Sequence, residues 1–179
     1  PEWLTAFTAS GNGGTSARML SATIAAQQGV TSNPHNETLR KAEPVSGIYD
    51  LSTKGGTTAM NTANCYVINA PGKYSLPLVY GNAVKNGSTN ASAYTSQASG
   101  TYVLKTFVNH LDAPITDPYI YNNADCTPNN AILVWQDEPD LVTNVALAPD
   151  GHSLTFEVGS STIRQGNAIV AVRDASNRI

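Results

Sequence analysis

Three aromatic side chains are the residues of this sequence whose types and surroundings suggest binding chemistry. Tyr119, Tyr121 and Trp135 lie in or beside segments rich in Asn, Asp and Thr. Flat rings stack on the CH faces of sugars while nearby polar groups bind the hydroxyls, so these three are the candidate glycan-stacking residues. Core packing is the favoured alternative, because Tyr119 and Tyr121 alternate as residues of a strand do and Trp135 ends the most apolar run of the chain.

The sequence contains no recognised catalytic or metal-binding pattern. Its three histidines are His35, His110 and His152. His110 precedes Asp112 by two positions, but no Gly-x-Ser-x-Gly turn supplies a nucleophile, so a turn or surface histidine is the better interpretation. No Cys-x2-Cys or His-Glu-x-x-His spacing indicates zinc, and no glycine-rich phosphate loop indicates a nucleotide. We therefore predict no catalytic residue, no metal ligand and no cofactor, and we interpret the protein as not an enzyme.

The densest acidic group consists of Asp137, Glu138 and Asp140. With Asn129 or Asn130 nearby it offers oxygens to Ca²⁺, but calcium needs about six to eight oxygen ligands in a defined loop, and no Asp-x-Asp-x-Asp-Gly repeat is present. A solvated loop is the favoured interpretation. A carboxylate pair for glycoside hydrolysis is less favoured still, because two groups so close in sequence seldom lie on opposite sides of a sugar.

The two cysteines, Cys65 and Cys126, leave two possibilities open. A disulfide between them is possible in an oxidising compartment, and a pair of free thiols is equally compatible with the sequence. No sequence rule places the two Cα atoms within the separation of about 4.4 to 6.8 Å that a disulfide requires.

The balance of charges excludes two classes of partner. The 179 residues hold 10 Lys and Arg against 13 Asp and Glu, which gives a formal net charge of -3, and the basic residues are thinly spread. Nucleic acids and anionic membranes are bound by clustered basic side chains, so we expect neither as a partner. Charged residues make up 13% of the chain, about half the usual share of about 25%. This composition is typical of an exported β-protein, and no apolar run in it is long enough for membrane insertion.

Turn residues and two-residue alternation divide the chain into three parts. Residues 1–31 hold two apolar stretches around a glycine-rich loop, and we interpret them as the C-terminal strands of a preceding β-sandwich-like domain. Residues 32–46 are polar, contain two prolines and predict a linker. Residues 47–179 predict an all-β domain, an immunoglobulin-like or transthyretin-like β-sandwich that is truncated at its C-terminal end.

Short strands separated by turn signals are expected within the third part. We predict two hairpins, residues 64–69 with 74–80 around a turn at 70–73 in which Gly72 has a positive φ, and residues 141–147 with 153–158. Residues 131–135 predict a central strand and residues 167–172 a final strand, and residues 86–101 predict a mobile exposed loop. Residues 102–111 could be helix or strand, and strand is favoured. A turn begins at Asp174 and the sequence stops at Ile179, so we expect the final strand to find its partner beyond Ile179 or in another subunit.

Several long strings of the third part resemble a known kind of surface protein. These strings are residues 49–56, 61–68, 76–87, 133–137 and 165–172. They resemble a region of the fimbrillin-like cell-surface lipoproteins of gut anaerobic bacteria, and the opening strand resembles the end of the BACON-type β-sandwich associated with that region. The resemblance implies a location outside the cell or at the outer-membrane surface, and it implies an adhesive or structural role with no catalytic residues to transfer.

Three functions follow from these observations. The leading hypothesis is a non-catalytic structural or adhesive module of an exported bacterial cell-surface protein, with other modules or subunits as partners through strand pairing. The alternatives are a carbohydrate-binding module of a surface glycan-utilisation protein, whose partners are glycans, and an accessory domain of a hydrolase.

Overall fold

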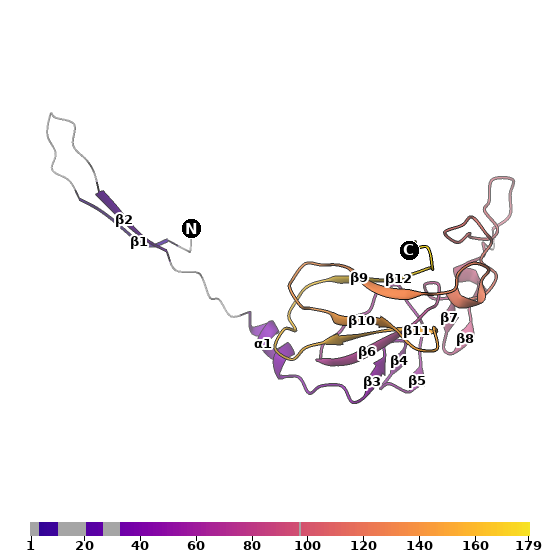
Figure 1. Ribbon diagram of the computed structural model, residues 1–179, viewed down its shortest axis with the longest axis horizontal. Helices are drawn as coiled ribbons and strands as arrows, with labels where there is room; N and C mark the ends of the chain where they lie inside the picture. Colours follow the sequence, from indigo (N-terminus) through magenta and orange to yellow (C-terminus); the bar gives the residue numbers. More distant parts are fainter. Residues whose placement is uncertain (1–3, 11–20, 27–32, 97) are drawn as a thin grey trace. The chain divides into compact units, whose positions relative to one another are not determined.

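The protein forms two compact units, Pro1–Asn33 and Pro34–Ile179 (Figure 1). The computed structural model describes all residues except 1–3, 11–20, 27–32 and 97, and it describes side chains from Asn33 onward. In the first unit two strands pair antiparallel, with Phe7 opposite Ile24; they are β1 (Leu4–Ser10) and β2 (Ser21–Ala26). Both strands expected in residues 1–31 are thus present.

A short helix, α1 (Pro34–Lys41), lies within the segment that the sequence predicts as a linker. Proline is common in the first turn of a helix, because the N–H that it lacks would have no hydrogen-bond partner within the helix. The positive charges of Arg40 and Lys41 in the last turn interact favourably with the negative end of the helix dipole. Leu39 is buried in the main core and anchors the helix there. The polar pattern of this segment did not indicate the helix, and its role as a linker remains a prediction.

A four-stranded sheet forms one side of the second unit. Its order is β10 (Thr143–Leu147), β11 (Ser153–Val158), β6 (Gly72–Pro77) and β3 (Ile48–Asp50), and only β3 and β6 pair in parallel. The predicted hairpin of β10 and β11 is confirmed. Alternate residues of β11, namely Leu154, Phe156 and Val158, are buried, as the period of a half-buried strand requires.

The other predicted hairpin, residues 64–69 with 74–80, is wrong. Both edges of β6 are taken by other strands, β11 on one side and β3 on the other. Residues 64–69 are irregular: Ile68 packs partly against the main core, whereas Val67 is almost fully exposed. The turn expected at residues 70–73 is absent, because Gly72 is already the first residue of β6. Gly72 does have the positive φ expected of it, 144°, and a Cβ there would clash with Val45.

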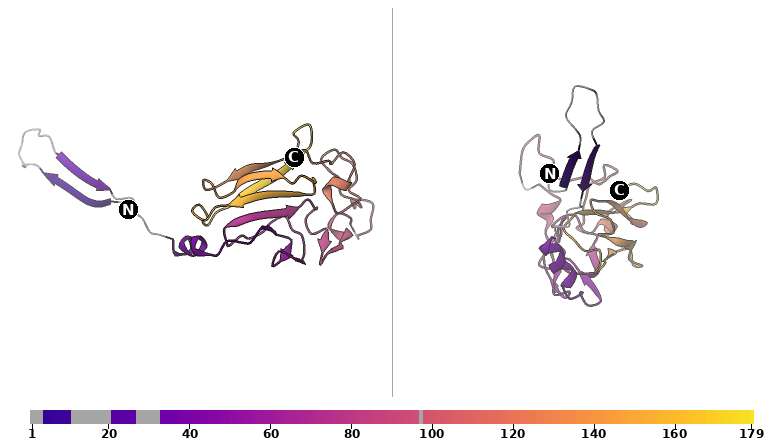
Figure 2. Two further views of the ribbon diagram at one scale, coloured as in Figure 1. Left: turned by 60° about the horizontal axis from the view of Figure 1, so that its bottom comes forward. Right: turned by 90° about the vertical axis from the view of Figure 1, so that its left-hand side faces the viewer.

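A two-stranded sheet covers the core from the opposite side (Figure 2). It consists of β9 (Asn130–Gln136) and β12 (Ala168–Arg173), paired antiparallel. Leu133, Val170 and Val172 pack against the core around Leu154 and Phe156. The prediction of β9 as a fully buried central strand is wrong, because its sheet has only two strands and Val134 and Trp135 are about half exposed.

The final strand has a partner, contrary to the expectation from its position. β12 pairs with β9 along one edge, and the four strands of the other sheet do not reach its second edge. Among the residues that the structure describes, no strand lies along that second edge. The expectation that β12 finds its partner outside the chain is therefore wrong for the edge paired with β9, and it remains a prediction for the second edge.

Short elements and irregular segments form one end of the second unit. These are β4 (Thr53–Lys54), β5 (Thr58–Ala59), β7 (Val84–Lys85), β8 (Ser88–Thr89), η1 (Ala91–Ala93) and η2 (Ile120–Asn122). Tyr94 is buried in a second small core with Val79 and Ile115, so residues 86–101 are not the wholly exposed loop that their polarity suggests. The strand predicted at 102–111 is wrong, because only the isolated bridges of Thr106 and Val108 form there.

The all-β prediction is confirmed by these elements, since strands predominate and α1 is the only α-helix in the described part of the chain. An immunoglobulin-like or transthyretin-like topology remains a prediction. No helix in the described ranges has the length and apolar character needed to cross a membrane.

Candidate functional site

An apolar cavity of about 580 Å³ lies between the two sheets of the second unit. Side chains from β6, β11 and β12 form one part of its wall, among them Leu76, Leu154 and Val170. Irregular segments and η2 form the rest, through Phe107, Ile120 and their neighbours. This volume falls within the range of about 300 to 1,000 Å³ that is typical of ligand sites in proteins.

The cavity runs along the second edge of β12. Four consecutive residues of the strand line it: Val170, Ala171, Val172 and Arg173. Successive side chains of a strand point to opposite faces of its sheet, so one face of a strand exposes only every second residue. Because four consecutive residues line the cavity, the cavity lies along the edge of the strand. An unpaired strand edge presents backbone N–H and C=O groups, which gives an otherwise apolar cavity a row of hydrogen-bonding groups.

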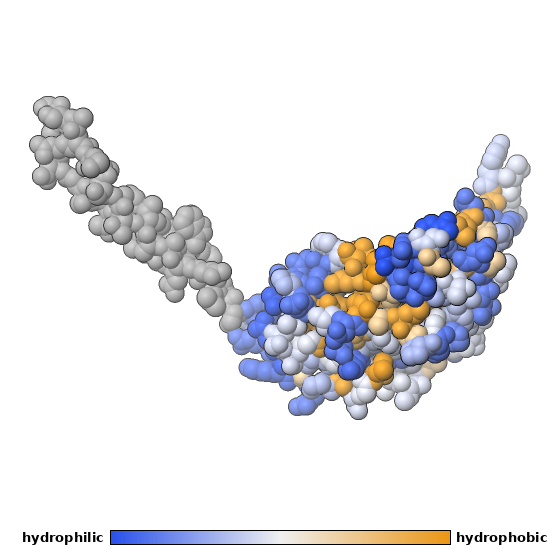
Figure 3. Space-filling model, viewed as in Figure 1, coloured by the Kyte–Doolittle hydropathy of each residue, from blue (hydrophilic) through white to orange (hydrophobic). Residues whose placement is uncertain are grey.

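Apolar side chains also reach the surface beside this edge. Figure 3 shows them around β9, β12 and the hydrophilic C-terminal residues. On the outer face Trp135 lies opposite Ile169 across the two strands, and the two are 50% and 54% exposed. The β9–β12 sheet is therefore less completely covered than β11, whose Leu154 is only 1% exposed.

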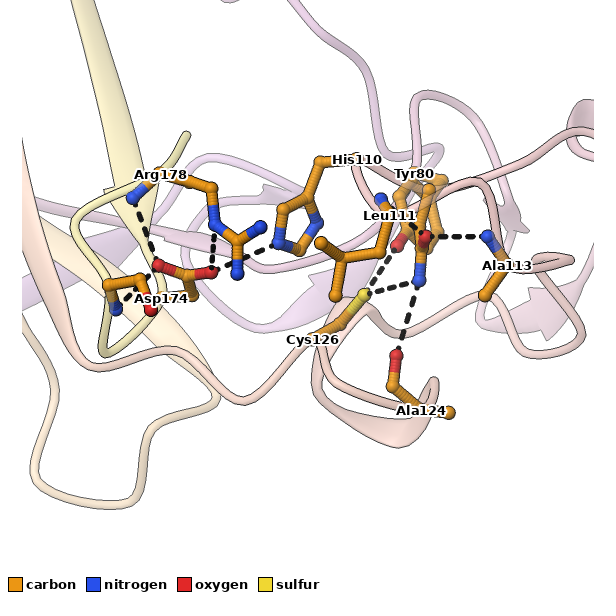
Figure 4. Close-up of polar contacts among 10 residues, drawn as sticks. Tyr80, His110, Leu111, Ala113, Ala124, Cys126, Asp174 and Arg178 are labelled. Atoms are coloured by element: carbon orange, nitrogen blue, oxygen red, sulfur yellow. Dashed lines mark hydrogen bonds and ion pairs between the residues drawn. The ribbon is translucent and has the colours of Figure 1, made fainter.

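Charged residues lie at one end of the cavity, where the chain turns after β12. The carboxylate of Asp174 accepts hydrogen bonds from the backbone N–H groups of Ser176 and Arg178, at 2.8 and 2.9 Å. Its second oxygen, Oδ2, lies 3.1 Å from Arg178 Nε and 3.2 Å from His110 Nε2 (Figure 4). The backbone hydrogen bond from Arg178 holds the pKa of Asp174 below its ordinary value, and the contact with His110 lowers this pKa further.

A separate polar group lies deeper, around the buried thiol of Cys126. The Tyr80 hydroxyl and the Asn109 amide nitrogen lie 3.7 and 3.1 Å from Cys126 Sγ (Figure 4). Burial, together with the contact to this thiol, raises the pKa of Tyr80. Cys65 is exposed and both cysteines are free, so the structure contains no Cys65–Cys126 disulfide.

The structure brings together two of the three predicted glycan-stacking residues. The rings of Tyr119 and Tyr121 have centroids 5.4 Å apart, and Tyr121 stacks on His152 at 4.0 Å. Both tyrosines also pack partly against the apolar cores. Trp135 lies on β9, and within the described residues no ring contact joins it to the tyrosines.

The acidic group after β9 is engaged in holding loops together. Asp137 accepts hydrogen bonds from the backbone N–H and the side-chain amide of Asn167, at 2.7 and 2.9 Å, and these lower its pKa. Glu138 pairs with Arg164 at 3.2 Å. In the described part of the chain, no three His, Cys, Asp or Glu side chains lie close enough to hold a metal ion.

Sequence reasoning missed the cavity, although one signal for it exists. Residues 168–172 are an uncharged β-branched run, and such a run on an unprotected edge invites a further strand. The opposite wall comes from segments such as 107–110 and 126–128, which no local pattern connects with that strand.

Comparisons of the chain with protein-family models, with curated proteins and with solved structures gave no match.

Proposed function

We propose that this protein is a non-catalytic module of an exported bacterial cell-surface assembly, and that it joins its neighbours by accepting an extended strand along the second edge of β12. The observation that carries the proposal is the apolar cavity alongside that edge. The resemblance of residues 47–172 to fimbrillin-like surface proteins supports the cellular setting.

The shape of the cavity favours a free extended segment over the edge of a folded sheet. The cavity is lined by Phe107 and His110 as well as by Val170 and Val172. A folded partner would have to bring its whole sheet alongside β12, where segments other than β12 also line the cavity. A single strand can pair its backbone with β12 while its alternate side chains face Leu76 and Leu154.

A designed peptide tests this proposal directly. A capped seven-residue peptide that alternates Thr and Val should bind the full chain and raise its melting temperature, because a ligand specific to the folded state stabilises it. The matched control replaces the central Val by Pro, which removes a backbone donor and disfavours the strand.

Cys126 supplies a second readout, because it lines the cavity. In a Cys65→Ser background the Thr-Val peptide should slow the reaction of Cys126 with a thiol reagent, and the Pro-containing peptide should not. An unchanged melting temperature together with an unchanged labelling rate would contradict the proposal.

Carbohydrate binding is a second candidate, favoured by the half-exposed indole of Trp135 and the ring cluster of Tyr119 and Tyr121. A glycan array with wild type, Trp135→Ala and Tyr121→Ala tests it. Sugar binding that is lost in either variant would support this candidate, and an array without signal would reject it for the glycans tested.

A further inference from the structure

One end of the cavity is lined by charged residues, whereas the rest of its wall is mostly apolar. Four titratable side chains lie there: Arg173, Arg178, Asp174 and His110. Counted over side chains alone and with histidine neutral, two positive charges and one negative charge give +1 at this end, whereas the same count over the whole chain gives -3. The cavity therefore has a locally positive end on a negatively charged protein.

The aspartate of this group is already fully engaged. Its two oxygens accept four hydrogen bonds, two from backbone N–H groups, one from Arg178 Nε and one at His110 Nε2. Two acceptor positions on each carboxylate oxygen are thereby used. Asp174 consequently positions Arg178 but has no remaining acceptor position for an incoming group.

The two guanidinium groups do have donors to spare. Arg178 uses Nε on Asp174, and Arg173 uses Nε on Asn130 Oδ1 at 2.8 Å. Within the described residues, no partner occupies the Nη1 and Nη2 atoms of either arginine. Two such nitrogens on one guanidinium match the two oxygens of a carboxylate.

The position of these arginines relative to β12 sets the direction of the partner. The strand runs from Ala168 to Arg173, so the positive end lies at and beyond its C-terminal end. Antiparallel pairing is the more stable arrangement of two strands. An antiparallel partner therefore places its N-terminal residues beside Arg178.

We propose that the strand accepted along β12 is an antiparallel one carrying an Asp or Glu side chain at its N-terminal end, where the carboxylate binds Arg178 and Arg173. This inference rests on the proposed function. Arg178 is 54% exposed in its side chain, so this end is open to solvent and the partner chain can continue beyond the acidic residue. The acidic residue fixes which way the strand enters and where it stops.

Three capped peptides test the inference on the full chain. Each has a Thr-Val alternating body; the first begins with Glu, the second begins with Gln, and the third ends with Glu. Affinities are measured by fluorescence anisotropy at 50 and 500 mM NaCl. At low salt the Glu-first peptide should bind about fivefold more tightly than either of the others, as a partly exposed ion pair would produce. The advantage should shrink to less than about twofold at high salt.

Two variants test whether Arg178 causes the preference for the Glu-first peptide. Arg178→Gln should remove most of the advantage of the Glu-first peptide over the Gln-first peptide. Arg164→Gln is the matched control, because Arg164 pairs with Glu138 and does not line the cavity, and it should retain the advantage. Circular dichroism melts confirm that each variant is folded.

The possible failures are distinguishable. If no peptide binds, the proposed function is wrong and the inference falls with it. If all three peptides bind equally, strand acceptance stands and the acidic recognition is overturned. If the Glu-last peptide binds most tightly, the antiparallel direction is overturned.

Discussion

At the scale of single residues, Asp174 organises the chain after β12. Its backbone N–H donates to the carbonyl of Arg178 at 2.9 Å, and its carboxylate accepts from the backbone of Ser176 and Arg178. The side chain of Asp174 also contacts His110, which is 64 positions away in sequence. One carboxylate thus joins a local turn to a distant segment beside the cavity.

The lowered pKa of Asp174 predicts a pH dependence of stability. Because the folded pKa is below the ordinary value of 3.8, the stabilisation is complete above that value and is lost as the pH falls through the folded pKa. We expect wild type to be more stable than Asp174→Asn at pH 6, and the difference to shrink steadily below about pH 4. Urea unfolding at pH 6, 4, 3 and 2 measures it.

Asp112→Asn is the control for this experiment, because Asp112 is exposed and already has the positive φ that asparagine tolerates. The effect of Asp174 is the part of its pH dependence that exceeds the change measured for this control. A gap between wild type and Asp174→Asn that stays constant down to pH 2 would contradict the assignment.

The contrast between the two thiols gives a second prediction at this scale. Cys65 is exposed, whereas Cys126 is buried beneath Tyr80 and Asn109. We expect a thiol reagent to modify one cysteine rapidly in the native protein and both in denaturant, with mass spectrometry placing the first modification on Cys65. Modification of neither thiol before reduction would instead indicate a disulfide.

At the scale of elements, the two sheets carry unequal shares of the core. Leu154 of β11 is fully buried between β6 and β10, whereas Ile169 of β12 is more than half exposed. A strand with neighbours on both sides and a covered face loses more on truncation than a strand at an edge.

We therefore expect Leu154→Ala to lower the free energy of unfolding by about 2 to 5 kcal/mol, the usual cost of a cavity in a core. Ile169→Ala, the matched aliphatic truncation on β12, should cost less than about 1 kcal/mol. Urea denaturation measures both. Equal losses would mean that the β9–β12 sheet is as fully packed as the other.

The segment after β8 yields a prediction on proteolysis. Tyr94 is 5% exposed in the second core, whereas Tyr102 is fully exposed. Brief digestion with chymotrypsin, which cleaves after aromatic residues, should cut after Tyr102 and spare Tyr94. Early cleavage after Tyr94 would show that the second core opens readily in solution.

At the scale of the whole molecule, the second unit is held by two apolar clusters. The larger lies between the two sheets around Leu154 and Phe156, and the smaller lies under the irregular end around Tyr94 and Ile115. The hydrophobic effect scales with buried apolar area and needs no ion to act. The fold of this unit should therefore not depend on a bound metal ion.

We expect EDTA to leave the melting temperature unchanged, since among the described residues no cluster of metal-ligating side chains is present and Asp137 and Glu138 have protein partners. Differential scanning calorimetry with and without the chelator checks this. A fall of several degrees would reveal a structural ion.

Features that depend on neighbouring residues could be predicted from the sequence. Two-residue alternation in 153–158 and the turn before it predict the β10–β11 hairpin, because a hairpin joins adjacent segments. Strand content and the shortage of amphipathic helical patterns likewise predict the all-β class. A positive φ at Gly72 was also predictable, because glycine is the residue that adopts it without strain, although Gly72 lies at the start of β6.

The pairing of distant segments, and the strand edge that this pairing leaves open, could not be predicted from the sequence. β6 pairs with β11 and β3 instead of with its sequence neighbour, and the meeting of His110 with Asp174 spans 64 positions. Pairing of this kind depends on which apolar faces fit together, and no local propensity encodes it. The cavity at β12 is undetermined by sequence for the same reason: an unpaired edge is defined by the strands that do not reach it.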